Sequence, residues 1–102
     1  MKHHRNIDKY TTAQEAKSNI LRSLAALRAD TLANKSSLGY AAFPGYSFKA
    51  PQGAAFAAAR LVRELEDEKL VRWISTSEPY SRYGYMITPK GREWLSKENH
   101  LA

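Results

Sequence analysis

The chain has 102 residues, which is enough for one domain with a single modest core. Its composition, 43% hydrophobic and 25% charged residues, excludes a disordered chain, and the absence of cysteine excludes disulfides, thiolate metal sites and a cysteine nucleophile. Lys and Arg total 16 against 10 Asp and Glu, and the resulting net charge of +6 favours an anionic partner.

Residues 1–10 are polar and basic without periodicity, and we expect them to form a flexible arm before a single domain over 11–99. Thr12 and Glu15 form a T-x-x-E capping box, which predicts a helix over 12–33. The residues that share its predicted core face are Ala13, Ala16, Ile20, Leu21, Leu24, Leu27 and Thr31.

A short second helix is expected after the sequence N-K-S-S, which interrupts the first. Either Ser36 or Ser37 would cap this helix, which would run through Phe43. Pro44 and Gly45 would then end it, and a long connection leads to the next helical stretch.

A third helix is predicted within residues 53–71, whose N-terminal part is almost entirely alanine. Small side chains let a neighbouring helix approach closely, so we expect the alanines to mark tight packing. Phe56, Arg60, Arg63 and Asp67 fall on the opposite face. The predicted core face contains Ala54, Ala55, Ala58, Leu61, Val62 and Leu65.

Phe56 allows two interpretations, because it lies on the polar face of the predicted helix. In the first, the preceding loop with Phe43, Tyr46 and Phe48 folds over its ring, which then belongs to the core. In the second, the ring is exposed beside guanidinium groups and is offered to a partner. The sequence favours neither.

A hairpin and a last helix complete the expected order. Alternating β-forming residues predict strands at 70–76 and 83–88, joined by a turn with Pro79 and Gly84. Thr88 followed by proline predicts the start of the final helix. The expected fold class is mainly α with a small β-hairpin (α+β), in the order helix, helix, helix, strand, strand, helix.

Two segments at this spacing carry a family resemblance. "ARLVRELEDEKLVRW", a hairpin and then "YMITPKGREWL" resemble the winged helix-turn-helix of MarR-type and related prokaryotic regulators, over residues 53–97. Two departures stand out. Lys69 occupies the position where the family usually has a left-handed glycine, so we expect this helix end to lack that residue. The turn before the third helix is also longer than usual.

The resemblance implies sequence-specific binding of double-stranded DNA, with the third helix in the major groove. Carried over position by position, the exposed residues of that helix are Gln52, Phe56, Ala57, Arg60 and Arg63. Arg pairs with guanine, Gln pairs with adenine, and Phe contacts a thymine methyl group.

Two further residues complete the implied DNA-binding set. Lys49 lies just before the third helix, where a helix N-terminus attracts phosphates. Arg82 lies near the tip of the wing, which would contact the backbone or the minor groove. The resemblance thus implies a small prokaryotic or phage transcriptional regulator in the cytoplasm. No membrane association is expected, because the apolar runs are too short to span a bilayer and no secretory leader is present.

Catalytic and metal chemistry is not expected. His3 and His4 are adjacent in the arm and His100 lies near the other end, so they lack the spacing of metal ligands. The acidic run at 64–68 lies at a solvated helix end, and the sequence contains no nucleophile elbow or phosphate-binding loop. We therefore expect neither an enzyme nor a bound cofactor.

The alternative function is a winged-helix module that binds another protein through exposed aromatics, namely Phe56, Tyr80 and Tyr83. Charge distinguishes the two functions. One continuous positive face that joins Lys49 and the three predicted arginines would favour DNA, whereas scattered charge would favour a protein. For either function we expect a homodimer, with the first and last helices at the contact.

Overall fold

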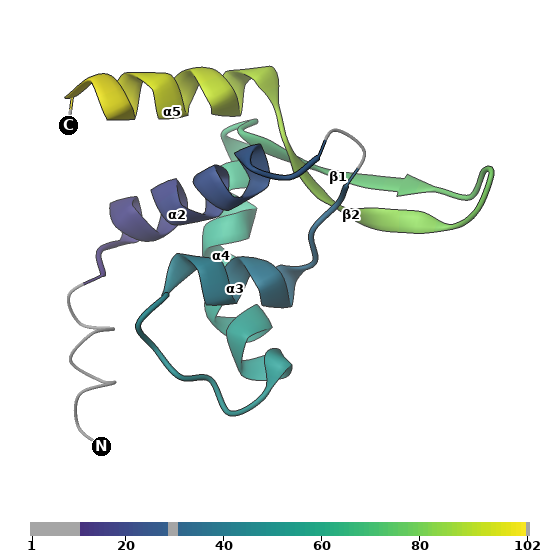
Figure 1. Ribbon diagram of the computed structural model, residues 1–102, viewed down its shortest axis with the longest axis horizontal. Coiled ribbons are helices and arrows are strands. Elements are labelled where there is room, and N and C mark those ends of the chain that lie inside the picture. The colour runs from purple at the N-terminus through teal and green to yellow at the C-terminus, as the bar shows by residue number, and fades with distance from the viewer. Residues whose placement is uncertain (1–10, 29–30, 102) are drawn as a thin grey trace.

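The computed structural model describes residues 11–28 and 31–101, and these residues form four helices and one antiparallel hairpin. The predicted α+β class and order of elements are confirmed. In Figure 1 the hairpin projects to one side of the helices, and the last helix runs across the top. The predicted arm over 1–10 lies outside the described residues. The elements are α2 (Ala13–Ala25), α3 (Lys35–Ala42), α4 (Pro51–Asp67), β1 (Val71–Thr76), β2 (Arg82–Ile87) and α5 (Pro89–Leu101).

α2 begins as predicted but ends early. The Thr12 hydroxyl accepts a hydrogen bond from the Glu15 amide at 3.0 Å, and the Glu15 carboxylate accepts one from the Thr12 amide at 3.1 Å. The helix ends at Ala25, so the prediction of a helix to residue 33 is wrong. Ala33 instead exchanges two backbone hydrogen bonds with Tyr85, at 2.8 and 3.1 Å, which requires an extended backbone. Two residues of the predicted core face are exposed: Ala13 and Thr31.

α3 is capped by Asn34 rather than by a serine. The Asn34 side chain accepts a hydrogen bond from the Ser37 amide at 2.8 Å, and asparagine is among the strongest N-cap residues. The Ser36 hydroxyl donates instead to the Pro51 carbonyl at 3.1 Å, which ties the start of α3 to the start of α4. Phe43 is the C-cap of α3, close to the predicted end.

The most extensive contact between helices is the crossing of α3 and α4. Gly39 of α3 is buried there, and a Cβ at this position would lie 2.9 Å from the Ala54 Cα and closer still to the Ala54 carbonyl. Ala54 and Ala58 are fully buried. The predicted role of the alanines in tight packing is therefore confirmed for these two, because a larger side chain would separate the helices.

The core joins the described helices to the base of the hairpin. Its cluster draws on every element, with Leu95 as the contribution of α5. The largest fully buried side chains are Ile20, Leu21, Leu38, Val62 and Leu65.

The two strands pair antiparallel from Val71 opposite Ile87 to Thr76 opposite Arg82. Both predicted strands are confirmed to within a residue at each end. The bridge between Ala33 and β2 anchors the hairpin beside α3. Gly84 permits this approach, because its φ is +150° and a Cβ there would lie 2.8 Å from the Ala33 carbonyl oxygen.

The C-terminus of α4 corrects an expectation. Lys69 itself adopts the left-handed conformation, with φ of 67°, although its family position usually holds glycine. The Leu70 amide donates to the Leu65 carbonyl at 2.9 Å, and the Lys69 amide donates to the Glu66 carbonyl at 3.0 Å. These two bonds form a Schellman motif, and the motif holds the lysine in a conformation that costs a side-chain-bearing residue energy.

The start of α5 is as predicted. The Thr88 hydroxyl accepts from the Gly91 amide at 2.9 Å and donates to the Lys69 carbonyl at 2.7 Å. At the other end of the helix, Glu98 accepts hydrogen bonds from Gln14 at 2.9 Å and from Ser18 at 3.4 Å. α5 is thereby fixed to α2.

Candidate functional site

The outer face of α4 exposes an aromatic ring between cations. Phe56 is 85% exposed, the Arg60 side chain is 88% exposed, and Arg63 is also exposed. Gln52, in the first turn, lies in solvent as well. The first interpretation of Phe56 is therefore wrong, because the ring is exposed and is not part of the core. That the ring is offered to a partner stays a prediction.

The loop before α4 does not cover this face because its aromatic rings pack on one another. Phe48 makes edge-on contacts with Tyr46, Tyr40 and Phe43, at centroid distances of 4.7, 5.6 and 6.5 Å. A Cβ at Gly53 would lie 3.7 Å from the Phe48 ring, so the cluster sits against the first turn of α4. The outer side of the second turn of α4, which carries Phe56, is left open to solvent.

A network of ion pairs links α4 to α2. Lys17 Nζ lies 3.0 Å from Glu64 and 3.3 Å from Glu68, and Arg60 Nε lies 3.6 Å from Glu64. The hydrogen bond and charge of Lys17 lower the pKa of Glu64. Burial lowers the pKa of Lys17, but its hydrogen bonds with Glu64 and Glu68 outweigh this effect, so the net shift is upward. Glu64 therefore stays ionised and its charge is balanced by Lys17.

Charge divides the chain sharply along its length. Residues 31–63, which form α3, the connecting loop and most of α4, contain no aspartate or glutamate. The acids of α4 follow directly, in the run at 64–68. This segment of the chain therefore offers cations and no carboxylate of its own to an anion. The charged residues of the acid-free segment are Lys35, Lys49, Arg60 and Arg63.

The hairpin carries a second aromatic group. Trp73 stacks on Tyr83, with ring centroids 6.1 Å apart and planes 28° apart, and contacts Tyr85 edge-on at 4.9 Å. Trp73 is 48% exposed and Tyr83 is 68% exposed. Together with the start of α3, these rings line a cavity of about 310 Å³. Its lining residues are Asn34, Lys35, Trp73, Tyr83, Gly84 and Tyr85.

Sequence reasoning missed Trp73 as a surface residue. The signal was its register, because Trp73 pairs with Tyr85 across the hairpin and lies two residues beyond buried Val71 on the same face of β1. Residues i and i+2 of a strand share one face, so a tryptophan just beyond the edge of the core on that face remains half-exposed. Burial raises the pKa of Tyr85, and the Glu66 carboxylate raises it further, so the Tyr85 hydroxyl is neutral at physiological pH.

The predicted site residues fall into two groups. One group belongs to α4 and the residues just before it, and the other lies on the hairpin. The α4 group consists of Lys49, Gln52, Phe56, Arg60 and Arg63. Figure 1 shows the hairpin projecting away from the N-terminal half of α4. The hairpin residues are Tyr80, Arg82 and Tyr83.

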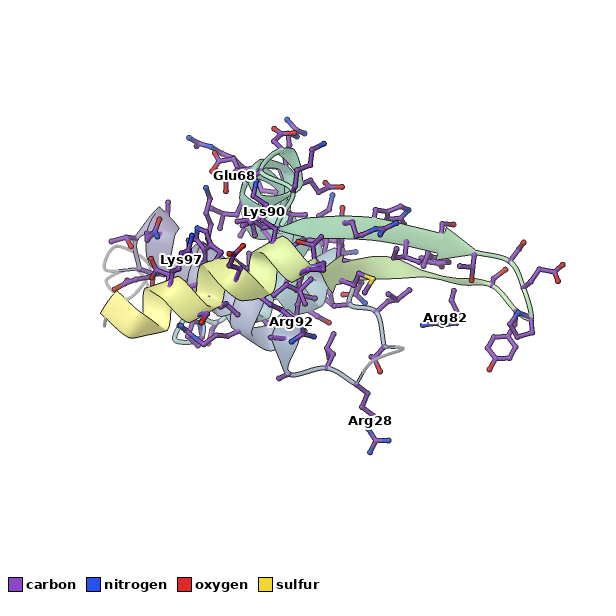
Figure 2. All side chains as sticks on the ribbon, turned by 90° about the horizontal axis from the view of Figure 1, so that it is seen from above. Arg28, Glu68, Arg82, Lys90, Arg92 and Lys97 are labelled. Carbon is purple, nitrogen blue, oxygen red and sulfur yellow. The ribbon has the colours of Figure 1, made fainter. Side chains whose placement is uncertain are left out.

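The predicted cations do not form one cluster. Figure 2 shows Arg82 on the hairpin, Arg28 on the loop after α2, and Lys90, Arg92 and Lys97 along α5. Positive charge is therefore present on several sides of the molecule, a distribution that by the charge criterion above favours the protein partner. The acid-free α3–α4 segment differs in lacking acids rather than in holding most of the cations, and this lack is what favours DNA.

The exposed aromatics also lie apart. Among the side chains that the structure describes, the exposed large apolar ones belong to α3, α4 and the hairpin with its turn, and neither α2 nor α5 as far as residue 98 contributes one. The dimer contact expected through the first and last helices stays a prediction. The exposed residues are Tyr40, Phe56, Trp73, Tyr80 and Tyr83.

Within residues 11–28 and 31–98, no group of three or more acidic, histidine or cysteine side chains is placed to hold a metal ion. The helices of these segments are too short or too polar to cross a bilayer. Compared with protein-family models, curated proteins and solved structures, the chain matches none of them.

Proposed function

We propose that this protein binds double-stranded DNA through the outer face of α4, as a winged-helix regulator of transcription. The observation that carries the proposal is the acid-free segment over 31–63, which ends in a rigid helix with Phe56, Arg60 and Arg63 in solvent. On α4 and just before it, a polyanion meets three cations, Lys49, Arg60 and Arg63, and no carboxylate until Glu64. Lys17 balances that carboxylate through a 3.0 Å ion pair.

The shape of α4 suits the major groove. Arg60 and Arg63 are long donors that reach the O6 and N7 atoms of guanine, and Phe56 supplies an apolar contact for a thymine methyl group. Ala57 and Ala59 flank these side chains and are small, so the helix backbone can lie close to the base edges. Lys49 and Gln52 flank the start of the helix, where backbone amides and cations favour phosphates.

In this proposal the hairpin is the wing that accompanies α4. It is anchored beside α3 by the Ala33 bridge and projects laterally, so that a duplex lying along α4 can extend past it (Figure 1). Arg82 at the start of β2 would then contact the sugar–phosphate backbone or the minor groove.

The test is fluorescence anisotropy with labelled duplex DNA, first of random sequence and then of a selected site, at several salt concentrations. Arg60→Ala should weaken specific binding by about 1–3 kcal/mol, and Arg82→Ala should weaken binding to all sequences and reduce the salt slope by roughly one. Arg92→Ala is the matched control, because Arg92 is an exposed arginine on α5. It should bind like the wild type.

The proposal fails if Arg60→Ala and Arg82→Ala both leave low-salt affinity unchanged. The exposed aromatics would then be better explained by protein docking. A single docking surface made of Phe56, Tyr80 and Tyr83 has less support, because the ring of α4 and the two hairpin tyrosines lie on separate parts of the molecule.

A further inference from the structure

The cavity between the hairpin and the start of α3 is built differently from the outer face of α4. Its wall is formed by the rings of Trp73, Tyr83 and Tyr85, with Lys35 as its cation. Its volume of about 310 Å³ is at the lower end of the range of about 300–1,000 Å³ for small-molecule sites. The cavity therefore suits one planar group rather than a folded surface.

The ring geometry leaves a π-face available. Trp73 and Tyr83 are nearly parallel, at 28°, yet both remain substantially exposed, so their own stacking does not use up their faces. Tyr85 is buried and contacts Trp73 edge-on, which restricts the tryptophan ring. A preformed aromatic platform of this kind stacks well on a nucleobase, since every base has a π-face.

Charge favours a nucleotide as the occupant of the cavity over a peptide without acidic residues. Lys35 lies in the acid-free segment and makes no ion pair with the described residues. Asn34 is already committed, because its side chain caps the Ser37 amide. The cavity thus offers stacking and one phosphate contact but little hydrogen-bond readout, the combination that single-stranded nucleic acid requires.

We propose that this aromatic cavity holds an unpaired nucleobase from a single-stranded segment that adjoins the duplex on α4. Such a segment can reach the cavity because the start of α3, which lines it, is tied to the start of α4 by the hydrogen bond from Ser36 to the Pro51 carbonyl. Stacking on Trp73 and Tyr83 holds the base, and Lys35 pairs with its phosphate. The inference rests on the proposed function for the duplex part of the ligand only. It predicts that the protein binds a duplex with a single-stranded extension more tightly than a blunt duplex.

The test uses intrinsic fluorescence in a Trp94→Phe background, where Trp73 is the only tryptophan. The probes are a blunt duplex, the same duplex with a short oligothymidine extension, and the extension alone. The extended duplex should quench Trp73 and bind about fivefold or more tighter than the blunt one. Lys35→Gln should lower the salt slope for the extended duplex by roughly 0.7 and leave the blunt duplex unchanged.

Tyr83→Ala and Tyr80→Ala form a matched pair. Both tyrosines are 68% exposed, but only Tyr83 lines the cavity. Tyr83→Ala should abolish the preference for the extended duplex, and Tyr80→Ala should keep it. Because the removed ring is mostly in solvent, the folded state should persist, and circular dichroism checks this.

The outcomes separate this inference from the proposed function. If the protein binds blunt and extended duplexes equally, without extra quenching, the inference is overturned and the duplex-binding function stands. If it binds only the extension, and Tyr83→Ala removes that binding, the inference stands and the duplex-binding function fails. If no oligonucleotide quenches Trp73, the cavity is not a nucleobase site and a peptide becomes the better occupant.

Discussion

Gly39→Ala tests the close contact that sets the position of α4 against α3. The added Cβ would lie 2.9 Å from the Ala54 Cα and closer to its carbonyl, whereas non-bonded carbons prefer about 3.5–4.0 Å. The helices must therefore separate by on the order of 1 Å, and overpacking of this kind costs about 1–3 kcal/mol. Alanine recovers up to about 1 kcal/mol of helix propensity. Because the atoms that the added Cβ meets are backbone atoms of Ala54 and cannot rotate away, we take the upper part of this range, about 2–3 kcal/mol, so that the expected net loss is about 1–2 kcal/mol.

Urea denaturation measures this loss, and the melting temperature should fall by about 4–8 °C for each kcal/mol. Gly53→Ala is the matched control in the same helix pair. A Cβ at Gly53 would meet only the Phe48 ring, at an ordinary 3.7 Å, so this change should stabilise the protein by about 0.4–1 kcal/mol. The reasoning is refuted if Gly39→Ala is as stable as the wild type, or if both changes shift stability in the same direction.

Three other predictions concern helix ends and the ion-pair network. Lys69→Gly should raise the free energy of unfolding by about 1 kcal/mol by relieving the left-handed conformation, whereas Lys69→Ala, which keeps a Cβ, should not. Thr88→Ala should cost about 1 kcal/mol in the same urea assay and Thr88→Ser much less, because only the hydroxyl caps α5. Since Lys17 lowers the pKa of Glu64 below 4.5, that carboxylate stabilises the fold above this pH, and the stabilisation is lost as the pH falls through the lowered pKa. The stability difference between wild type and Glu64→Gln should therefore be constant near pH 6 and vanish in acid, and a pH-independent difference would contradict the assignment.

The sequence predicts the elements well where local signals agree. The T-x-x-E box at Thr12, the threonine–proline pair at Thr88 and the alternation in both strands each have a direct backbone cause, and the structure confirms them. The C-terminus of α2 was mispredicted, because the extended backbone at Ala33 depends on hydrogen bonds to Tyr85, far away in the chain. Periodicity within a window carries no information about such a partner.

The candidate site, too, could be predicted where local spacing determines it and not where contacts distant in the sequence determine it. Helical spacing correctly placed Phe56, Arg60 and Arg63 on one exposed face. Whether the loop covered Phe56 could not be deduced, since the answer depended on the aromatic rings around Phe48 preferring one another. The cavity beside Trp73 could not be predicted from the sequence either, because residues of two strands and of the start of α3 line it together.

The attachment of α5 to α2 has a consequence for synthesis of the chain on the ribosome. Glu98 receives its hydrogen bonds from Gln14 and Ser18, so the first described helix cannot complete its contacts until the last has left the exit tunnel. α3 and α4 can cross earlier, because their contacts are closer in sequence and cost less loop entropy. The nascent chain should therefore pass through a stage in which the α4 face is formed while α2 still lacks α5. Ribosome-stalled chains of increasing length should acquire partial protease resistance once α4 has emerged and full resistance only after α5 emerges.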